Sequence, residues 1–97
     1  MIRDTMSSLP IDRYQLRLEH YNNRLRIIIA NDSEEIVCRK ETRNNLLNFL
    51  ESNEHMLFKG RLQLMNDDTF VSIIVKGELI GRVEKTDFIH LIHSLNK

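Results

Sequence analysis

The chain begins its regular structure with residues that alternate between apolar and polar from Tyr14 onward. Tyr14, Leu16 and Leu18 share one side of the backbone, and charged or amide side chains occupy the other. This period of two predicts a strand with one buried face. The Asn22-Asn23 pair predicts a turn because Asn tolerates positive φ. A return strand over 24–30 and a third short strand over 35–40 are expected to follow.

The period changes after this third strand. Thr42 can cap a helix, and the next apolar residues form one stripe at helical spacing, namely Leu46, Leu47, Phe49 and Leu50. The second half repeats this order with a long strand over 56–65, a return strand over 69–76 and a third strand over 78–83. A last helix is expected to be capped by Thr86 or Asp87.

The two halves can be aligned block by block. For example, Leu25, Ile27 and Ile28 correspond to Val71, Ile73 and Ile74. Chance patterning is the alternative, but the shared order favours a duplicated β-β-β-α unit, with repeats at about 14–53 and 56–97.

The predicted fold is therefore a single α+β domain over 13–97. We expect a two-layer sandwich in which one antiparallel sheet of six strands carries two helices on one face. Residues 1–12 lack periodicity and contain Ser7-Ser8-Leu9-Pro10, which predicts a flexible N-terminal leader.

Composition limits the possible functions. The 97 residues contain 14 Lys plus Arg and 14 Asp plus Glu, so the net charge is zero and a strongly basic arm or an acidic tail is excluded. A domain this small buries a core only marginally, which favours a homodimer.

No apolar run spans a bilayer and the start of the chain lacks a signal-like apolar region, so we expect a cytoplasmic protein without a membrane role. Cys38 is the one cysteine and is expected to be a free, buried thiol.

The charges nevertheless segregate along the strands. Basic residues occupy the strand positions opposite the core-facing aliphatic residues, and aromatic residues are interleaved with them. The predicted nucleic-acid-binding set is Arg17, Arg24, Arg26, Arg39, Lys59, Arg61, Lys76, Arg82, Tyr21 and Phe70. Two alternatives stay open. One is a plain solvated face. The other is a protein interface, because the apolar residues Ile28, Ile74 and Ile80 lie on the same side of the strands as the basic residues.

No catalytic constellation is apparent. His90 and His93 lie three residues apart on the expected last helix and would need a third ligand from elsewhere to hold a metal ion. The acidic pairs fall in exposed turns and lack the cleft that catalytic carboxylates need, and no glycine-rich phosphate loop is present. We expect no catalytic residues, no metal and no cofactor, so the chain is not predicted to be an enzyme.

Two sequence blocks carry a resemblance to a known family. They are RLRIIIANDSEEIVCRKETRNNLLNFL and TFVSIIVKGELIGRVEKTDFIHLI. Their order, several strands and then a helix, resembles PUR-type repeats and related folds that bind single-stranded nucleic acid. The resemblance covers roughly residues 14–96 and implies that helices cover one sheet face while basic and aromatic strand residues engage nucleic acid. The chain departs from the family by showing three strands per repeat where the family has four.

We therefore expect a small, non-enzymatic binding module that binds single-stranded DNA or RNA through a basic sheet face. The alternative is a protein–protein interaction module, a dimeric adaptor or inhibitor with no nucleic-acid role.

Overall fold

The structure is a computed structural model that describes residues 6–52 and 55–95. Four strands and a helix come first, β1 (Met6–Ile11), β2 (Tyr14–Tyr21), β3 (Arg24–Ala30), β4 (Glu35–Glu41) and α1 (Arg43–Glu51). The same order follows in β5 (Met56–Leu57), β6 (Leu62–Asp67), β7 (Phe70–Val75), β8 (Glu78–Glu84) and α2 (Lys85–Ser94).

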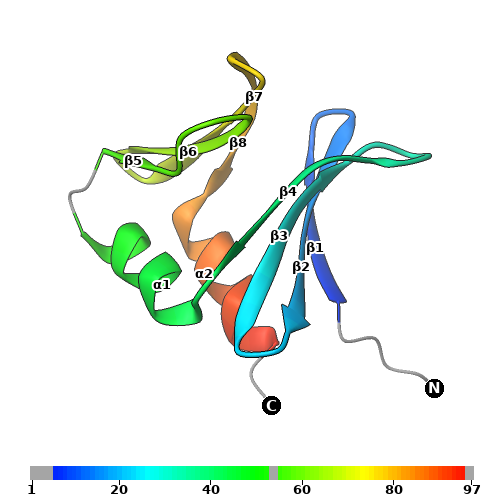
Figure 1. The fold of residues 1–97 in the computed structure, drawn as a ribbon. Helices are drawn as coiled ribbons and strands as arrows, with labels where there is room; N and C mark the ends of the chain where they lie inside the picture. Colours follow the sequence, from blue (N-terminus) through cyan, green and yellow to red (C-terminus); the bar gives the residue numbers. More distant parts are fainter. Residues whose placement is uncertain (1–5, 53–54, 96–97) are drawn as a thin grey trace.

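The α+β class with antiparallel pairing is confirmed, but the strands form two sheets and not one. Each sheet has four strands in sequential order, β1-β2-β3-β4 and β5-β6-β7-β8. In Figure 1 the two helices lie side by side, beneath the β5–β8 sheet and beside the β1–β4 sheet. The expected single sheet of six strands is therefore wrong.

The first half contains a strand that we expected to be part of a flexible leader. Met6–Ile11 form β1, which pairs with β2 so that Leu9 lies opposite Leu16. Pro10 interrupts no ladder because β1 is the edge strand of its sheet. Residues 1–5 of the expected leader lie outside the described residues.

The strand expected over 56–65 is a hairpin. β5 is two residues long, and residues 58–61 form a loop before β6, which turns back so that Met56 lies opposite Met65. Two residues in this loop have positive φ, Phe58 at 73° and Gly60 at 106°.

The sequence predicted the start of α1 correctly but not that of α2. Thr42 caps α1, since its hydroxyl accepts a hydrogen bond from the Asn45 N–H at 3.2 Å. α2 begins at Lys85, earlier than a cap at Thr86 or Asp87 would place it, and its N-cap residue Glu84 makes no side-chain capping bond.

Both sheets and both helices contribute to one core. Residues from both sheets and both helices belong to a single buried cluster, and the following are fully buried: Leu16, Leu18, Ile27, Ile29, Leu46, Phe49, Leu64, Val71, Ile73, Phe88 and Ile92. Burial of this apolar surface is the main term that stabilises the fold. We call the side of each sheet that faces away from this core its outer face.

Each half carries a β-bulge between its third and fourth strands. The register shifts between Ile29 and Ala30 in one sheet and between Ile73 and Ile74 in the other. Ile36 and Ile80 are consequently the extra residues without a partner in the ladder.

The two sheets contact each other along β1 and β8. The Cβ of an L-residue at position 81 would lie 2.4 Å from Cγ2 of Ile11, and Gly81 itself has a φ of +154°. Only glycine therefore allows this close approach between the sheets.

We predict that Gly81→Ala lowers the free energy of unfolding by about 2 kcal/mol or more, because it adds a steric clash to backbone strain. Gly77→Ala is the matched control, since Gly77 also has positive φ but has no atom near its would-be Cβ. The control should lose only about 1 kcal/mol. Urea denaturation measures both losses, and equal losses would contradict a tight β1–β8 contact.

Candidate nucleic-acid interface

The ten residues of the predicted binding set lie on three surfaces. Strand register places Arg17, Tyr21, Arg24 and Arg26 on the outer face of the first sheet. Arg39, Lys59, Arg61 and Lys76 gather where β4 meets the second sheet, as described below. The outer face of the second sheet carries Phe70 and Arg82.

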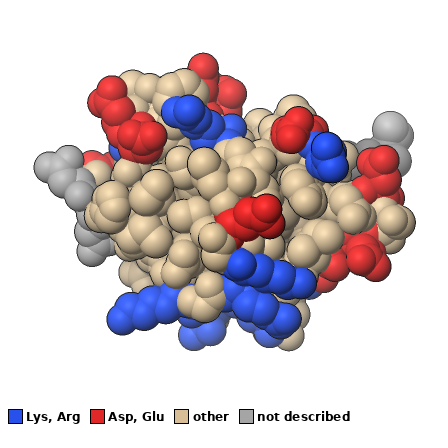
Figure 2. Space-filling model, turned by 90° about the horizontal axis from the view of Figure 1, so that it is seen from above, with Lys and Arg blue, Asp and Glu red and all other residues tan. Residues whose placement is uncertain are grey.

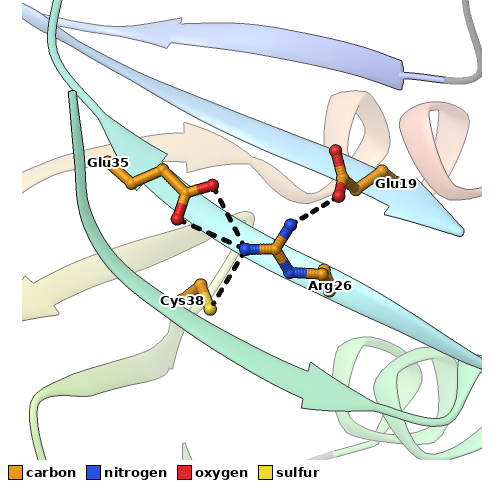
Figure 3. A network of polar contacts seen from close by, with 4 residues as sticks. All are labelled: Glu19, Arg26, Glu35 and Cys38. Carbon is orange, nitrogen blue, oxygen red and sulfur yellow. Dashed lines mark hydrogen bonds and ion pairs between the residues drawn. The ribbon is translucent and has the colours of Figure 1, made fainter. Parts of the chain in front are cut away.

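On the first outer face, Arg26 is the centre of a polar network (Figure 3). Its Nη1 donates to Oε1 of Glu19 at 2.6 Å, and its Nη2 lies 3.1 Å from Oε2 of Glu35 and 3.5 Å from the Cys38 sulfur. Hydrogen bonds to Cys38 and then to Glu19 raise the pKa of the Arg26 guanidinium above its ordinary value. Two carboxylates thus balance the charge of Arg26, which ties β2, β3 and β4 together.

Cys38 is exposed, so the expected buried thiol is wrong. Val37 occupies the core position on β4 and is 7% exposed. Alternation along the strand then turns Cys38 to the outer face, opposite Ile28 on β3.

One end of the first outer face carries an exposed aromatic ring. Tyr21 is 43% exposed, and Nζ of Lys40 lies 4.3 Å from the centre of its ring. Arg24 is the cross-strand partner of Tyr21. Arg17, farther along β2, donates from Nε to Gln15 at 3.2 Å.

Arg39 lies on the other side of β4 from the side that we expected. It pairs with the core residue Ile27, so it belongs to the inner side of its sheet, at the edge of the core. The reason is the bulge at Ile36, which makes Val37 the core residue. Each later residue of β4 therefore faces the side opposite to the one expected.

The Arg39 side chain reaches across to the second sheet. Its Nη1 donates to the carbonyl oxygen of Lys59 at 2.8 Å, and its guanidinium lies 4.7 Å from the centre of the Phe58 ring. Hence β4 and the 58–61 loop form one continuous edge.

Two further basic residues join this edge from the loop. Lys59 and Arg61 belong to the loop and not to a strand as expected, and the Lys76 N–H donates to the Arg61 carbonyl oxygen at 2.7 Å. We name Arg39, Lys40, Lys59, Arg61 and Lys76 the basic edge, to which Lys40 belongs from the outer face of β4. Figure 2 shows Lys and Arg side chains crowded along one side of the molecule.

The cations of the basic edge have no acidic partner in the described part of the chain. Among residues 6–52 and 55–95, carboxylates lie within ion-pair distance only of Arg26 and of Arg82. Sequence reasoning missed two residues here. Lys40 was not in the predicted set, and Phe58 was placed inside a strand.

The outer face of the second sheet is less suited to phosphate. Arg82 lies 3.8 Å from Asp67 and stacks over Phe70 at 5.2 Å, so both predicted residues are already engaged. The neighbouring groove between β1 and β8 also contains Glu84 and Asp87.

The apolar residues proposed for a protein interface are largely covered. Ile28 is 1% exposed, and Ile74 and Ile80 are half-buried. Leu79, at 60% exposure, is the most exposed of the large apolar residues described.

Comparison with protein-family models, with curated proteins and with solved structures gives no match for this chain. Within the described part of the chain, no helix has the length and apolar character needed to cross a membrane. The same residues contain no group of three or more His, Cys, Asp or Glu side chains that could hold a metal ion.

We predict that Arg26→Gln lowers the free energy of unfolding by about 1–2 kcal/mol, because Glu19 and Glu35 then lose the cation between them. Arg24→Gln changes the same strand and face at a residue that has no acidic partner among residues 6–52 and 55–95, and its effect should stay within about 0.5 kcal/mol. Urea denaturation compares the two variants. Equal stability of the two would show that the network does not hold the strands together.

Proposed function

We propose that this chain is a non-enzymatic module that binds single-stranded DNA or RNA along the basic edge. The observation that carries the proposal is that this edge concentrates cations for which the described residues supply no carboxylate partner, on a chain of zero net charge. Unpaired Lys and Arg side chains neutralise phosphates and release condensed counterions, which is the main source of affinity for nucleic acid.

The aromatic rings favour single strands over duplexes. Tyr21 lies under Lys40, and Phe58 lies under Arg39, so each ring adjoins a cation of the basic edge. Stacking on such rings requires an unpaired base, because bases in a duplex are already stacked. Cation and ring together therefore suit a flexible single strand.

We also propose that the two halves are copies of one unit. In support, each half consists of four strands and a helix in the same order, with a bulge between its third and fourth strands. The strand number supports the resemblance to PUR-type repeats as well. Each half has four strands, as that family does, where the sequence had predicted three.

The alternative function is a homodimeric protein–protein interaction module. Leu79 favours it, since this large apolar residue is 60% exposed on β8, an edge strand of its sheet. We predict that Leu79→Gln converts a dimer to a monomer, as measured by sedimentation at several concentrations. A wild-type chain that sediments as a monomer would exclude this interface.

We predict that the wild-type chain binds labelled single-stranded oligonucleotides with an affinity that falls steeply as salt is raised from about 50 to 200 mM. Lys59→Glu combined with Arg61→Glu should weaken binding about tenfold or more. The pair should also reduce the slope of log affinity against log salt by about 1.4, because two phosphate contacts are lost. Fluorescence anisotropy measures both quantities.

The matched control combines Arg13→Glu with Lys85→Glu. It changes the net charge equally but at two residues outside the basic edge, one in the β1–β2 turn and one at the start of α2. The control should bind nearly as well as the wild type. If both double variants lost the same affinity, net charge alone would explain the loss and the basic edge would not be the binding site. If the wild type did not bind at low salt, the proposal would be wrong.

A further inference from the structure

A groove opens between β4 and the segment from Met56 to Lys59. Its volume is about 500 Å³, and its lining includes Arg39, Glu41, Phe58 and Gln63. This volume lies within the range of small-molecule sites in proteins, about 300–1,000 Å³.

Arg39 and Phe58 form a fixed platform in this groove. The guanidinium lies 4.7 Å from the centre of the ring, and the Lys59 carbonyl oxygen holds Nη1 at 2.8 Å. Two anchors fix the orientation of the guanidinium plane, so little freedom is lost when a ligand stacks against it. Unpaired bases stack on aromatic rings and on Arg planes alike.

The backbone at Phe58 is strained. Its φ of 73° lies in the left-handed region, which bulky residues rarely adopt. Strain of this kind persists where the surrounding structure enforces it and gathers at ligand sites. Here it presents an aromatic ring, half-buried, to the groove.

The polar groups of the groove restrict the ligand further. The Gln63 amide can both donate and accept hydrogen bonds, whereas the Glu41 carboxylate can only accept them. Oε2 of Glu41 already accepts from the Thr42 N–H at 3.0 Å and from Nδ2 of Asn45 at 2.8 Å. Both contacts hold the carboxylate in place at the groove.

We propose that this groove is a nucleobase subsite for one unpaired base that carries an exocyclic amino group. The base stacks against the Arg39 guanidinium, which Phe58 supports from its other side, its amino group donates to Glu41, and Lys59 contacts the adjoining phosphate. Cytosine, adenine and guanine carry such a group, and thymine and uracil do not. The inference rests on the proposed function, since the subsite takes a base from a bound single strand.

The first experiment compares cytosine with thymine, two bases of similar size. The wild-type chain should bind oligo-dC of about 12 nucleotides several-fold more tightly than oligo-dT of equal length near neutral pH. Glu41→Gln, which keeps an acceptor for Thr42 and Asn45, should abolish this preference. Equal affinity of the wild type for the two oligonucleotides would overturn the amino-group assignment.

The second experiment tests stacking with a 2-aminopurine placed inside the oligonucleotide, whose fluorescence is quenched when it stacks. Phe58→Leu should remove the protein-dependent quenching and weaken binding about tenfold. Arg39→Lys, which keeps the charge but removes the planar group, should also remove the quenching, and thermal melting verifies that both variants are folded. Tyr14→Leu is the control, at a half-buried ring packed against the core and away from the groove.

The outcomes separate the subsite from the proposed function. The subsite alone is overturned if Phe58→Leu and Arg39→Lys leave affinity and quenching unchanged. In that case binding is still salt-dependent and is still weakened by Lys59→Glu combined with Arg61→Glu. Absence of any binding by the wild type at low salt overturns both. Loss of quenching in both groove variants, with Tyr14→Leu like the wild type, supports the subsite.

Discussion

The structure depends on a single core that two separate sheets must share. Neither sheet of four strands covers its own apolar face, so the sheets lie against a common interior that the two helices complete. Sharing a core brings sheet edges together, at Ile11 and Gly81 on one side and at Arg39 and Lys59 on the other. The second contact aligns a strand of one half with a loop of the other.

This alignment creates a charged surface that neither half has alone. β4 contributes Arg39 and Lys40, and the second half contributes Lys59, Arg61 and Lys76. Acidic residues balance other cations, since Glu19 and Glu35 hold Arg26 and Asp67 lies near Arg82. A neutral chain thereby presents a local excess of positive charge, and the strained loop adds Phe58 to it.

Periodicity predicted the elements whose apolar residues repeat regularly. β2, β3, β7 and both helices lie close to their expected positions, because alternation and the helical stripe report directly which side is buried. β1 was missed because Ser7-Ser8 and Pro10 read as a linker, although an edge strand tolerates Pro. The site was harder to predict, since the bulge at Ile36 reversed the parity of Arg39, and the loop at Phe58 interrupted an apparent strand. Both features arise from contacts distant in sequence, which a local pattern does not contain.

Binding along the basic edge is tested most directly by NMR, which maps bound single-stranded DNA onto the folded chain. Backbone amide shifts of the ¹⁵N-labelled protein would be followed during titration with a short oligonucleotide at low salt. If single strands bind along the basic edge, the largest changes fall at Arg39, Lys40, residues 58–61 and Lys76. Changes concentrated on the outer face of β6–β8, or no changes at saturating oligonucleotide, would contradict such binding.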